Sequence, residues 1–134
     1  MDPRLLIVDD HAPFRAFARR LLSLDGFDVV GEAIDGAAGI CAARRLRPDV
    51  VLLDVQLPDI DGFRVAGALN AMTGAPAVVL VSSRSRDDYG AQVALSGARG
   101  FVAKAEVTGD ALRRALGDVA GTGPGRDGAT GPPL

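Results

Sequence analysis

Acidic, hydroxyl and ammonium side chains stand at or directly after the ends of four short apolar segments of this chain. They are the neighbours Asp9 and Asp10, then Asp54, Ser82 and Lys104. If the four segments are parallel strands, these groups gather at one edge of one sheet, the edge at which open α/β sheets bind ligands. Three carboxylates, a hydroxyl and an ammonium are suited to hold a divalent cation together with a phosphoryl group.

The carboxylates favour a hard cation. Converging carboxylates repel one another, and a bound cation removes that conflict. Because the candidate ligands are oxygens, with no cluster of Cys or His, the set favours Mg²⁺ over zinc. In this interpretation Asp10 and Asp54 are direct ligands and Asp9 acts through a water. The backbone carbonyl of Gln56 is a candidate for a further oxygen ligand.

An Asp carboxylate can also act as a nucleophile toward phosphorus, which gives an aspartyl phosphate. Mg²⁺ and Lys104 would then neutralise the phosphoryl oxygens, and Ser82 would donate a hydrogen bond to one of them. Any single Asp at a strand end has a simpler interpretation, because Asp often starts a turn or caps a helix. The simpler interpretation does not explain why such groups end successive strands.

Strand-like and helix-like segments alternate five times along the chain. Expected strands cover residues 4–8, 27–33, 50–54, 77–82 and 100–103, and expected helices cover 13–24, 36–46, 63–72, 86–96 and 108 or 109–119. This alternation predicts a doubly wound α/β fold, with a parallel sheet covered on both faces and right-handed crossovers. Residues 1–120 are expected to form one domain. Residues 121–134, rich in Gly, Pro and Thr, are expected to be a disordered tail or linker.

Composition indicates a single cytoplasmic domain. The chain has 134 residues, 48% of them hydrophobic, and a net charge of −2 that argues neither for nor against a nucleic-acid partner. No segment approaches the roughly 20 apolar residues that cross a bilayer, and the N-terminus lacks the order of a signal peptide. Cys41 is the only cysteine, so no internal disulfide is expected, and its side chain is expected to be buried.

Several other residues have both a functional and a structural interpretation. His11, the only histidine, is expected in a solvated loop beside the acidic pair rather than in a catalytic role. Gly62 is expected to supply a turn before the third helix. Arginines on the first and last helices form either a kinase-docking or dimerisation patch or an ordinary solvated face; they are Arg15, Arg19, Arg20, Arg113 and Arg114.

Four strings, LLIVDDH, PDVVLLDVQLPDIDGF, VVLVSS and GARGFVAK, resemble the receiver domain of bacterial two-component response regulators. The resemblance covers residues 4 to about 119 and is strongest to receivers with LuxR-type helix-turn-helix outputs. It implies a flavodoxin-like (βα)5 fold whose five-stranded parallel sheet has the order 2-1-3-4-5. Asp9 and Asp10 match the family's acidic pair, and Asp54 matches its phosphoacceptor. Ser82 matches the Thr or Ser that ends the family's fourth strand, and Lys104 matches the Lys that ends the fifth.

The resemblance also implies a mechanism. A sensor histidine kinase transfers a phosphoryl group to Asp54 with Mg²⁺, Ser82 moves toward that group, and Phe101 turns inward. The surface around the last strand and its flanking helices then changes its preference for partners, with a homodimer as one outcome. Ala105 departs from the family, which often has a cis proline after the Lys. A receiver is not an enzyme beyond its own phosphoryl transfer and dephosphorylation.

Three alternatives remain open at this point. The chain could be an interaction module that does not switch, or an aspartate-nucleophile phosphatase. Such phosphatases usually carry Asp-x-Asp after the first strand and a cap domain, and neither is evident here. The chain could also be a natural single domain or an N-terminal fragment of a transcriptional regulator. No nucleic-acid-binding motif is evident, so DNA would be a partner only through a downstream domain.

Overall fold

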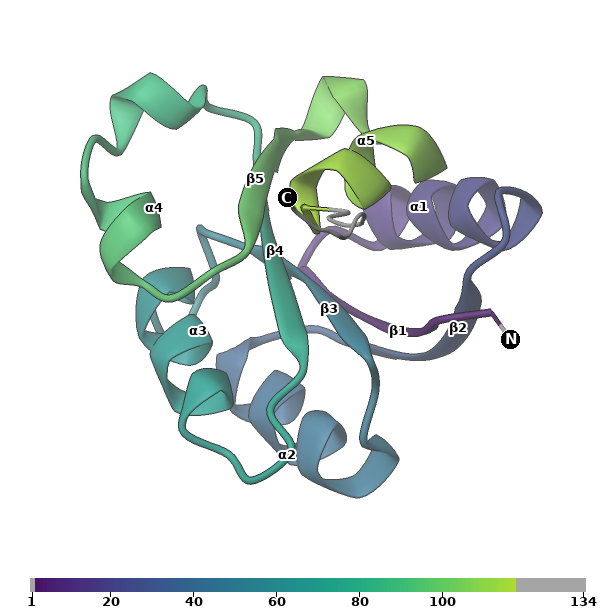
Figure 1. The fold of residues 1–134 in the computed structure, drawn as a ribbon, viewed down its shortest axis with the longest axis horizontal. Helices are drawn as coiled ribbons and strands as arrows, with labels where there is room; N and C mark the ends of the chain where they lie inside the picture. Colours follow the sequence, from purple (N-terminus) through teal and green to yellow (C-terminus); the bar gives the residue numbers. More distant parts are fainter. Residues whose placement is uncertain (1, 118–134) are drawn as a thin grey trace, which may run out of the picture.

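The computed structural model describes residues 2–117, in which strands and helices alternate as Figure 1 shows. The strands are β1 (Arg4–Val8), β2 (Asp28–Ala33), β3 (Val50–Asp54), β4 (Ala77–Ser82) and β5 (Gly100–Ala103). The α-helices are α1 (Ala12–Leu24), α2 (Gly36–Leu46), α3 (Gly62–Asn70), α4 (Gln92–Leu95) and α5 (Gly109–Ala115). Two short 3-10 helices, η1 (Arg86–Asp88) and η2 (Lys104–Glu106), flank β5 and α4 along the chain.

All five strands are parallel and form one sheet of order β2-β1-β3-β4-β5. This confirms the fold class expected from the sequence. The register places Val8 opposite Leu53, and Asp54 opposite Val81. Ser82 lies opposite Ala103. The carboxyl ends of β1, β3, β4 and β5 are therefore level with one another, and the residues that follow these strands share one edge.

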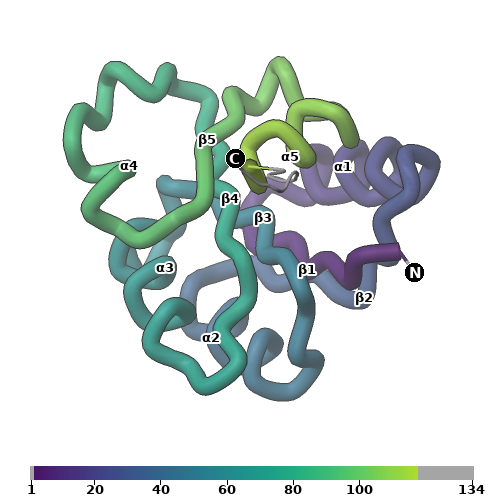
Figure 2. The backbone as a smooth tube through the Cα atoms, in the orientation of Figure 1, coloured from purple at the N-terminus to yellow at the C-terminus, as the bar shows by residue number. Residues whose placement is uncertain are grey.

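Helices cover both faces of the sheet. Helices α1 and α5 lie side by side on one face, and α2, α3 and α4 lie on the other (Figures 1 and 2). Alternate strand residues point to the two layers, so that Leu5 and Ile7 face α1 while Leu6 and Val8 face α2 and α3. Because both faces are covered, the central strands are apolar throughout rather than alternating with polar residues.

Short polar residues fix where several helices begin. Asp35 accepts a hydrogen bond from Ala38 N at 2.8 Å at the start of α2. Asp61 accepts one from Phe63 N at 2.7 Å at the start of α3. The Thr108 side chain likewise accepts a hydrogen bond from a backbone N–H in the first turn of α5. Pro13 lies in the first turn of α1, where its missing N–H costs nothing. These capping residues fix the point after each strand at which the following helix begins.

Several expected segments differ from the structure in their limits. The predicted helix over 86–96 is wrong, because only η1 and the four residues of α4 are helical. Gly90 has a φ of +58° between them, and this left-handed conformation interrupts the helix. Strand β2 begins at Asp28 rather than at residue 27, and α3 covers Gly62–Asn70 rather than 63–72. The last helix ends at Ala115 and is followed by a turn in which Gly117 has a φ of +75°, so its expected continuation to 119 is wrong. The expected tail at 121–134 lies outside the described residues.

Burial on two helices also differs from expectation. Cys41 is exposed, so its predicted burial is wrong. Helix α2 packs on the sheet through Gly39, Ala42 and Ala43, and position 41 falls on the opposite side of that stripe. Phe17 on α1, a large apolar residue that would be expected in the core, is 52% exposed. Within residues 2–117, no helix combines the length and apolar character needed to cross a bilayer.

Candidate phosphoryl-acceptor site

Three buried polar side chains mark one place in the fold. Among the described residues, the buried polar or charged positions are Asp9, Asp54 and Ser82, with relative exposures of 0%, 3% and 1%. Asp9 directly follows β1, Asp54 ends β3 and Ser82 ends β4. Polar groups are costly to bury unless something compensates them. The concentration of these groups at the carboxyl edge therefore indicates a site rather than a packing accident.

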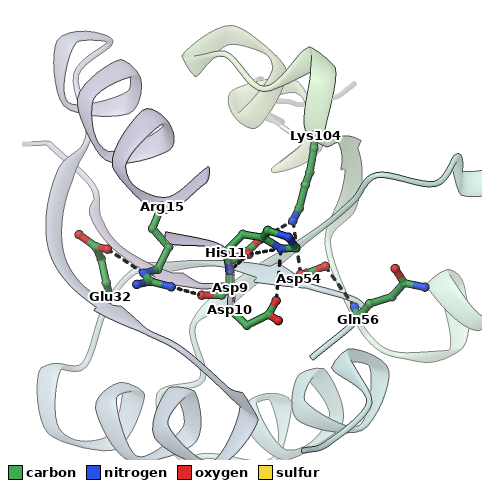
Figure 3. A network of polar contacts seen from close by, with 8 residues as sticks. All are labelled: Asp9, Asp10, His11, Arg15, Glu32, Asp54, Gln56 and Lys104. Atoms are coloured by element: carbon green, nitrogen blue, oxygen red, sulfur yellow. Dashed lines mark hydrogen bonds and ion pairs between the residues drawn. The ribbon is translucent and has the colours of Figure 1, made fainter. Parts of the chain in front are cut away.

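Lys104 reaches this edge from the start of η2, after β5. Its Nζ lies 2.8 Å from Asp9 Oδ2 and 3.4 Å from Asp54 Oδ2 (Figure 3). The Lys104 side chain is 18% exposed, so both ion pairs are largely shielded from water. Its Nζ also lies 4.7 Å from the centre of the Phe14 ring, a cation–π contact from α1. One ammonium thus connects the loops after β1, β3 and β5.

The three buried side chains are oriented in the same local way. Each accepts a hydrogen bond from the backbone N–H of the residue two positions further on. The donors are His11 N to Asp9 Oδ1 (2.8 Å), Gln56 N to Asp54 Oδ1 (3.1 Å) and Arg84 N to Ser82 Oγ (3.0 Å). Such turns are a known habit of Asp and Ser side chains. They leave the second carboxylate oxygen of Asp9 and of Asp54 facing Lys104.

The two remaining candidate ligands lie at the rim. The Asp10 side chain is 38% exposed, and its Oδ1 lies 3.6 Å from His11 Nδ1. One ligand atom from each of Asp9, Asp10 and His11 can be chosen so that all three lie within 4.8 Å of one another. Gln56 is exposed and its backbone N–H turns toward Asp54. The His11 side chain is 70% exposed, in agreement with the expected solvated position.

Burial changes the acidity of the central groups. Burial, and then the neighbouring charge of Asp9, raises the pKa of Asp54 from 3.8 to about 6, while the Gln56 N–H and Lys104 act in the opposite direction. Burial by itself would lower the pKa of Lys104, but its contacts with Asp9 and Asp54 outweigh burial and raise it. A charged ammonium therefore lies beside an Asp54 carboxyl that is harder to ionise than an exposed one.

The donor set fits a divalent cation. Asp9 Oδ2 is buried, and it is the one described buried side-chain oxygen or nitrogen without a hydrogen-bond partner. Lys104 lies close enough to form an ion pair with it, but outside hydrogen-bond geometry. Three carboxylates with one ammonium leave a surplus of negative charge. Because all the candidate ligand atoms are carboxylate oxygens and carry this negative charge, the site suits Mg²⁺, with Asp9, Asp10 and Asp54 as the candidate ligands.

Hollows on the surface differ in their relation to this site. A cavity of about 370 Å³ is lined by His11, Pro13, Phe14, Ser83 and Lys104, directly beside the buried acids. A larger hollow of about 770 Å³ includes Arg4 and Asp28, at the starts of β1 and β2, and its lining does not include Lys104. The chemistry points to the smaller cavity, because burial and charge, not volume, identify the site.

Two of the patch arginines, both on α1, form ion pairs with Glu32, and one of them, Arg15, also contacts the loop after β1. Arg15 donates to the backbone oxygen of Asp9 at 2.7 Å and to Glu32 Oε1 at 3.0 Å. Arg19 donates to Glu32 Oε2 at 2.8 Å (Figure 3 shows Arg15 and Glu32). Their charge is thus partly neutralised by Glu32 rather than presented as a free basic surface. The docking interpretation of these two arginines is correspondingly weaker.

Sequence reasoning missed one residue beside the site. Tyr89 Oη lies 2.6 Å from Ser82 Oγ. Its ring packs edge-on against Phe63 with centroids 5.4 Å apart, and lies 6.0 Å from the ring of Phe101. Tyr89 belongs to the segment that was expected to be a regular helix, and that expectation gave no indication that its side chain points toward Ser82. The available signal was that it is the only tyrosine in the chain, seven positions after Ser82.

Comparison with known proteins agrees with this geometry. The family model of the response regulator receiver domain matches residues 5–116, most of the chain. The chain belongs to this family. A signal receiver domain of NarL from Mycobacterium tuberculosis has a TM-score of 0.77 and 36% identity, covering 87% of this chain and 98% of that one. The resemblance inferred from the motifs is confirmed, and so is the fold.

Curated relatives of this receiver domain are longer proteins. The virulence transcription regulator BvgA of Bordetella pertussis is 37% identical over 119 residues, which are 88% of this chain and 56% of BvgA. A protein-glutamate methylesterase of Anaeromyxobacter dehalogenans is 46% identical over 104 residues, 77% of this chain and 29% of the methylesterase. The chain therefore spans about half, or less, of the relatives it matches.

Proposed function

We propose that this receiver domain accepts a phosphoryl group on Asp54 from the phosphohistidine of a sensor kinase. One observation carries the proposal: Asp54 is buried at the carboxyl edge with Asp9 and Ser82, and Lys104 contacts both acids. A structural role alone does not explain two buried carboxylates beside each other, because their repulsion costs free energy. A site that binds charged ligands explains it.

In the proposed reaction, an oxygen of the Asp54 carboxylate attacks phosphorus. A phosphorus–oxygen bond forms as the phosphorus–nitrogen bond breaks, and the electron pair of the broken bond leaves on the histidine nitrogen. Mg²⁺ held by Asp9, Asp10, Asp54 and the carbonyl of Gln56 would supply positive charge to the phosphoryl oxygens. Lys104 adds a second positive charge, and its position is fixed by Asp9, so catalysis is mainly positioning and charge neutralisation.

Phosphorylation then acts as a switch in this proposal. The new group adds roughly 1.5–2 negative charges at the edge of β3. Ser82 lies on the neighbouring strand and is the hydroxyl positioned to donate to a phosphoryl oxygen. Phe101 on β5 is half-buried against Tyr89, and its reorientation would pass the change to the surface of α4, β5 and α5. A sensor kinase, and a second copy of the chain, are the proposed partners.

The relatives support a transcriptional context for the domain. BvgA is a transcription regulator, and this chain matches about half of it. We infer that DNA would be reached only through a segment beyond the receiver, and that the receiver's own chemistry is limited to phosphoryl transfer and dephosphorylation at Asp54. The domain boundary near residue 120 and a cytoplasmic location stay predictions. A receiver that binds partners without switching is the alternative that the test below also addresses.

Acetyl phosphate and intact-protein mass spectrometry test the proposal. With Mg²⁺ present, the wild-type protein is expected to gain one phosphoryl group and Asp54→Ala to gain none. Asp110→Ala is the matched control, because Asp110 is a carboxylate on α5 whose side chain is 81% exposed. It should be labelled like the wild type. Labelling of Asp54→Ala, or labelling of the wild type that persists unchanged in excess chelator, would refute the assignment.

A further inference from the structure

The Ser82 hydroxyl forms hydrogen bonds with two neighbouring groups. Ser82 is 1% exposed, so water does not complete its bonding. Its Oγ accepts a hydrogen bond from Arg84 N at 3.0 Å. The only other polar contact described for Oγ is Tyr89 Oη at 2.6 Å. A serine hydroxyl has one proton to donate, and Tyr89 is the neighbour available to receive it.

Counting protons decides the direction of the Ser82–Tyr89 bond. If Tyr89 donated, the proton of buried Ser82 would have no acceptor, which is costly. If Ser82 donates, the proton of Tyr89 is free to reach solvent, because Tyr89 is only half-buried. The second arrangement satisfies both hydroxyls. Donation from Ser82 to Tyr89 is thus the direction that leaves no buried hydroxyl proton without an acceptor.

Packing holds the Tyr89 ring in the place that this bond requires. The ring lies between Phe63 at the start of α3 and Phe101 on β5, with centroid distances of 5.4 Å and 6.0 Å. Phe63 and Phe101 both belong to the core layer under α2 and α3. Tyr89 itself follows η1 in a segment broken by Gly90. Its position is set by aromatic neighbours rather than by a long helix.

We propose that Tyr89 is a positioning residue that holds the Ser82 proton while Asp54 is unmodified, so that a phosphoryl group on Asp54 must compete with Tyr89 for it. This inference rests on the proposed function of Asp54. Phe63 and Phe101 have no hydroxyl, so among the three packed rings Tyr89 alone can form a hydrogen bond with Ser82. Loss of the Ser82 bond frees Tyr89 Oη beside Phe101, and this links occupancy of Asp54 to the aromatic cluster.

The competition has a measurable size. Removal of the Tyr89 hydroxyl removes the competitor while keeping the ring between its neighbours. Tyr89→Phe is therefore expected to bind beryllofluoride, a phosphoryl mimic, about two- to tenfold more tightly than the wild type, the effect of one neutral hydrogen bond. The affinity is measured with Mg²⁺ present by ¹⁹F NMR of bound beryllofluoride. Circular dichroism checks that the variant keeps the fold.

Ser82 variants supply the matched controls. In the Ser82→Ala background the Tyr89→Phe change is expected to have no effect on affinity, because there is no proton to compete for. In the Ser82→Thr background the gain is expected to return, because the hydroxyl is restored. A purely structural role of Tyr89 would change affinity by the same factor in all three backgrounds, and that result would overturn the inference.

The wild-type protein offers an independent readout. Tyr89 is the only tyrosine and the chain has no tryptophan, so tyrosine fluorescence reports on this ring alone. Beryllofluoride is expected to change that fluorescence in the wild type and to leave it unchanged in Ser82→Ala. An equal change in both proteins would contradict the inference. Absence of Mg²⁺-dependent binding by the wild type would overturn the proposed function too, whereas binding unaffected by Tyr89→Phe overturns only this inference.

Discussion

At the scale of single residues, the buried acids of the site lower the stability of the folded protein. Asp54 is buried next to another buried carboxylate, Asp9, and a single ammonium serves both. The raised pKa of Asp54, about 6, expresses that penalty. A group whose pKa is higher in the folded state contributes stability below its unfolded pKa, here 3.8, and loses that contribution as the pH rises through about 6. The metal-free domain is therefore strained at neutral pH.

Asp54→Asn is expected to stabilise the metal-free protein at pH 7 by about 1–3 kcal/mol, since a shift of one pKa unit corresponds to about 1.4 kcal/mol. At pH 4 the wild-type carboxyl is already protonated in the folded state, so the gain should largely vanish. Urea denaturation in excess chelator at both pH values measures the difference. Asp110→Asn, on the exposed face of α5, serves as the control. The same gain at pH 4 and pH 7 would rule out this explanation.

At the scale of elements, the loop after β3 is held by a close backbone contact with α3. Gly62 N donates to Val55 O at 2.9 Å. A Cβ on Gly62 would lie 2.4 Å from Asp54 O and 2.6 Å from Val55 Cα. Gly62 was expected to supply a turn before the third helix, but it is the first residue of α3. Its lack of a side chain leaves space for the neighbouring backbone. Its small size lets the helix approach the backbone of Asp54 and Val55.

Two glycines of the same helix form a matched pair for testing this contact. Gly62→Ala is expected to destabilise the protein by about 2 kcal/mol or more, because backbone atoms must shift to admit the methyl group. Gly67→Ala has no atom within 4 Å of the added Cβ, so it is expected to stabilise by about 0.5–1 kcal/mol. Thermal denaturation of both variants is the measurement. A Gly62→Ala protein as stable as Gly67→Ala would show that the loop is not tightly held.

At the scale of the whole molecule, the parallel sheet turns distant residues into one site. Lys104 and Asp54 are fifty positions apart in sequence, and their side chains meet because β3, β4 and β5 are in register. The five strands end at one edge, and the loops there hold the acids while the two helical layers bury the sheet. The fold thus supplies rigidity, and the edge supplies excess negative charge that a cation can neutralise.

Mg²⁺ is therefore expected to stabilise the whole domain. A ligand that binds only the folded state at a hundred times its dissociation constant adds about 2.7 kcal/mol, which would raise the melting temperature by several degrees. Differential scanning fluorimetry with and without Mg²⁺ measures the shift. Asp10→Asn, which alters a rim carboxylate and leaves the buried pair intact, is expected to lose most of it. An equal shift in wild type and Asp10→Asn would exclude Asp10 as a ligand.

Much of the fold followed from local sequence patterns. Apolar runs bounded by turn residues predicted all five strands within a residue of their observed limits, because burial on both faces leaves a clear signal in sequence. The acidic and hydroxyl groups at the strand ends could be identified because parallel strands share an edge. Helical periodicity was less reliable where packing is partial. Cys41 and Phe17 are exposed, and the segment around Gly90 does not continue as a helix.

The sequence by itself determined which chemical groups stand at the sheet edge, since residue type and strand limits are local properties of the chain. Only the tertiary structure decided how those groups pair. It showed that Lys104 contacts Asp9 more closely than Asp54, that Arg15 supports the loop of Asp9, and that Tyr89 bonds to Ser82. Such pairings depend on side-chain directions and on contacts between elements far apart in the chain, and no local pattern carries that information.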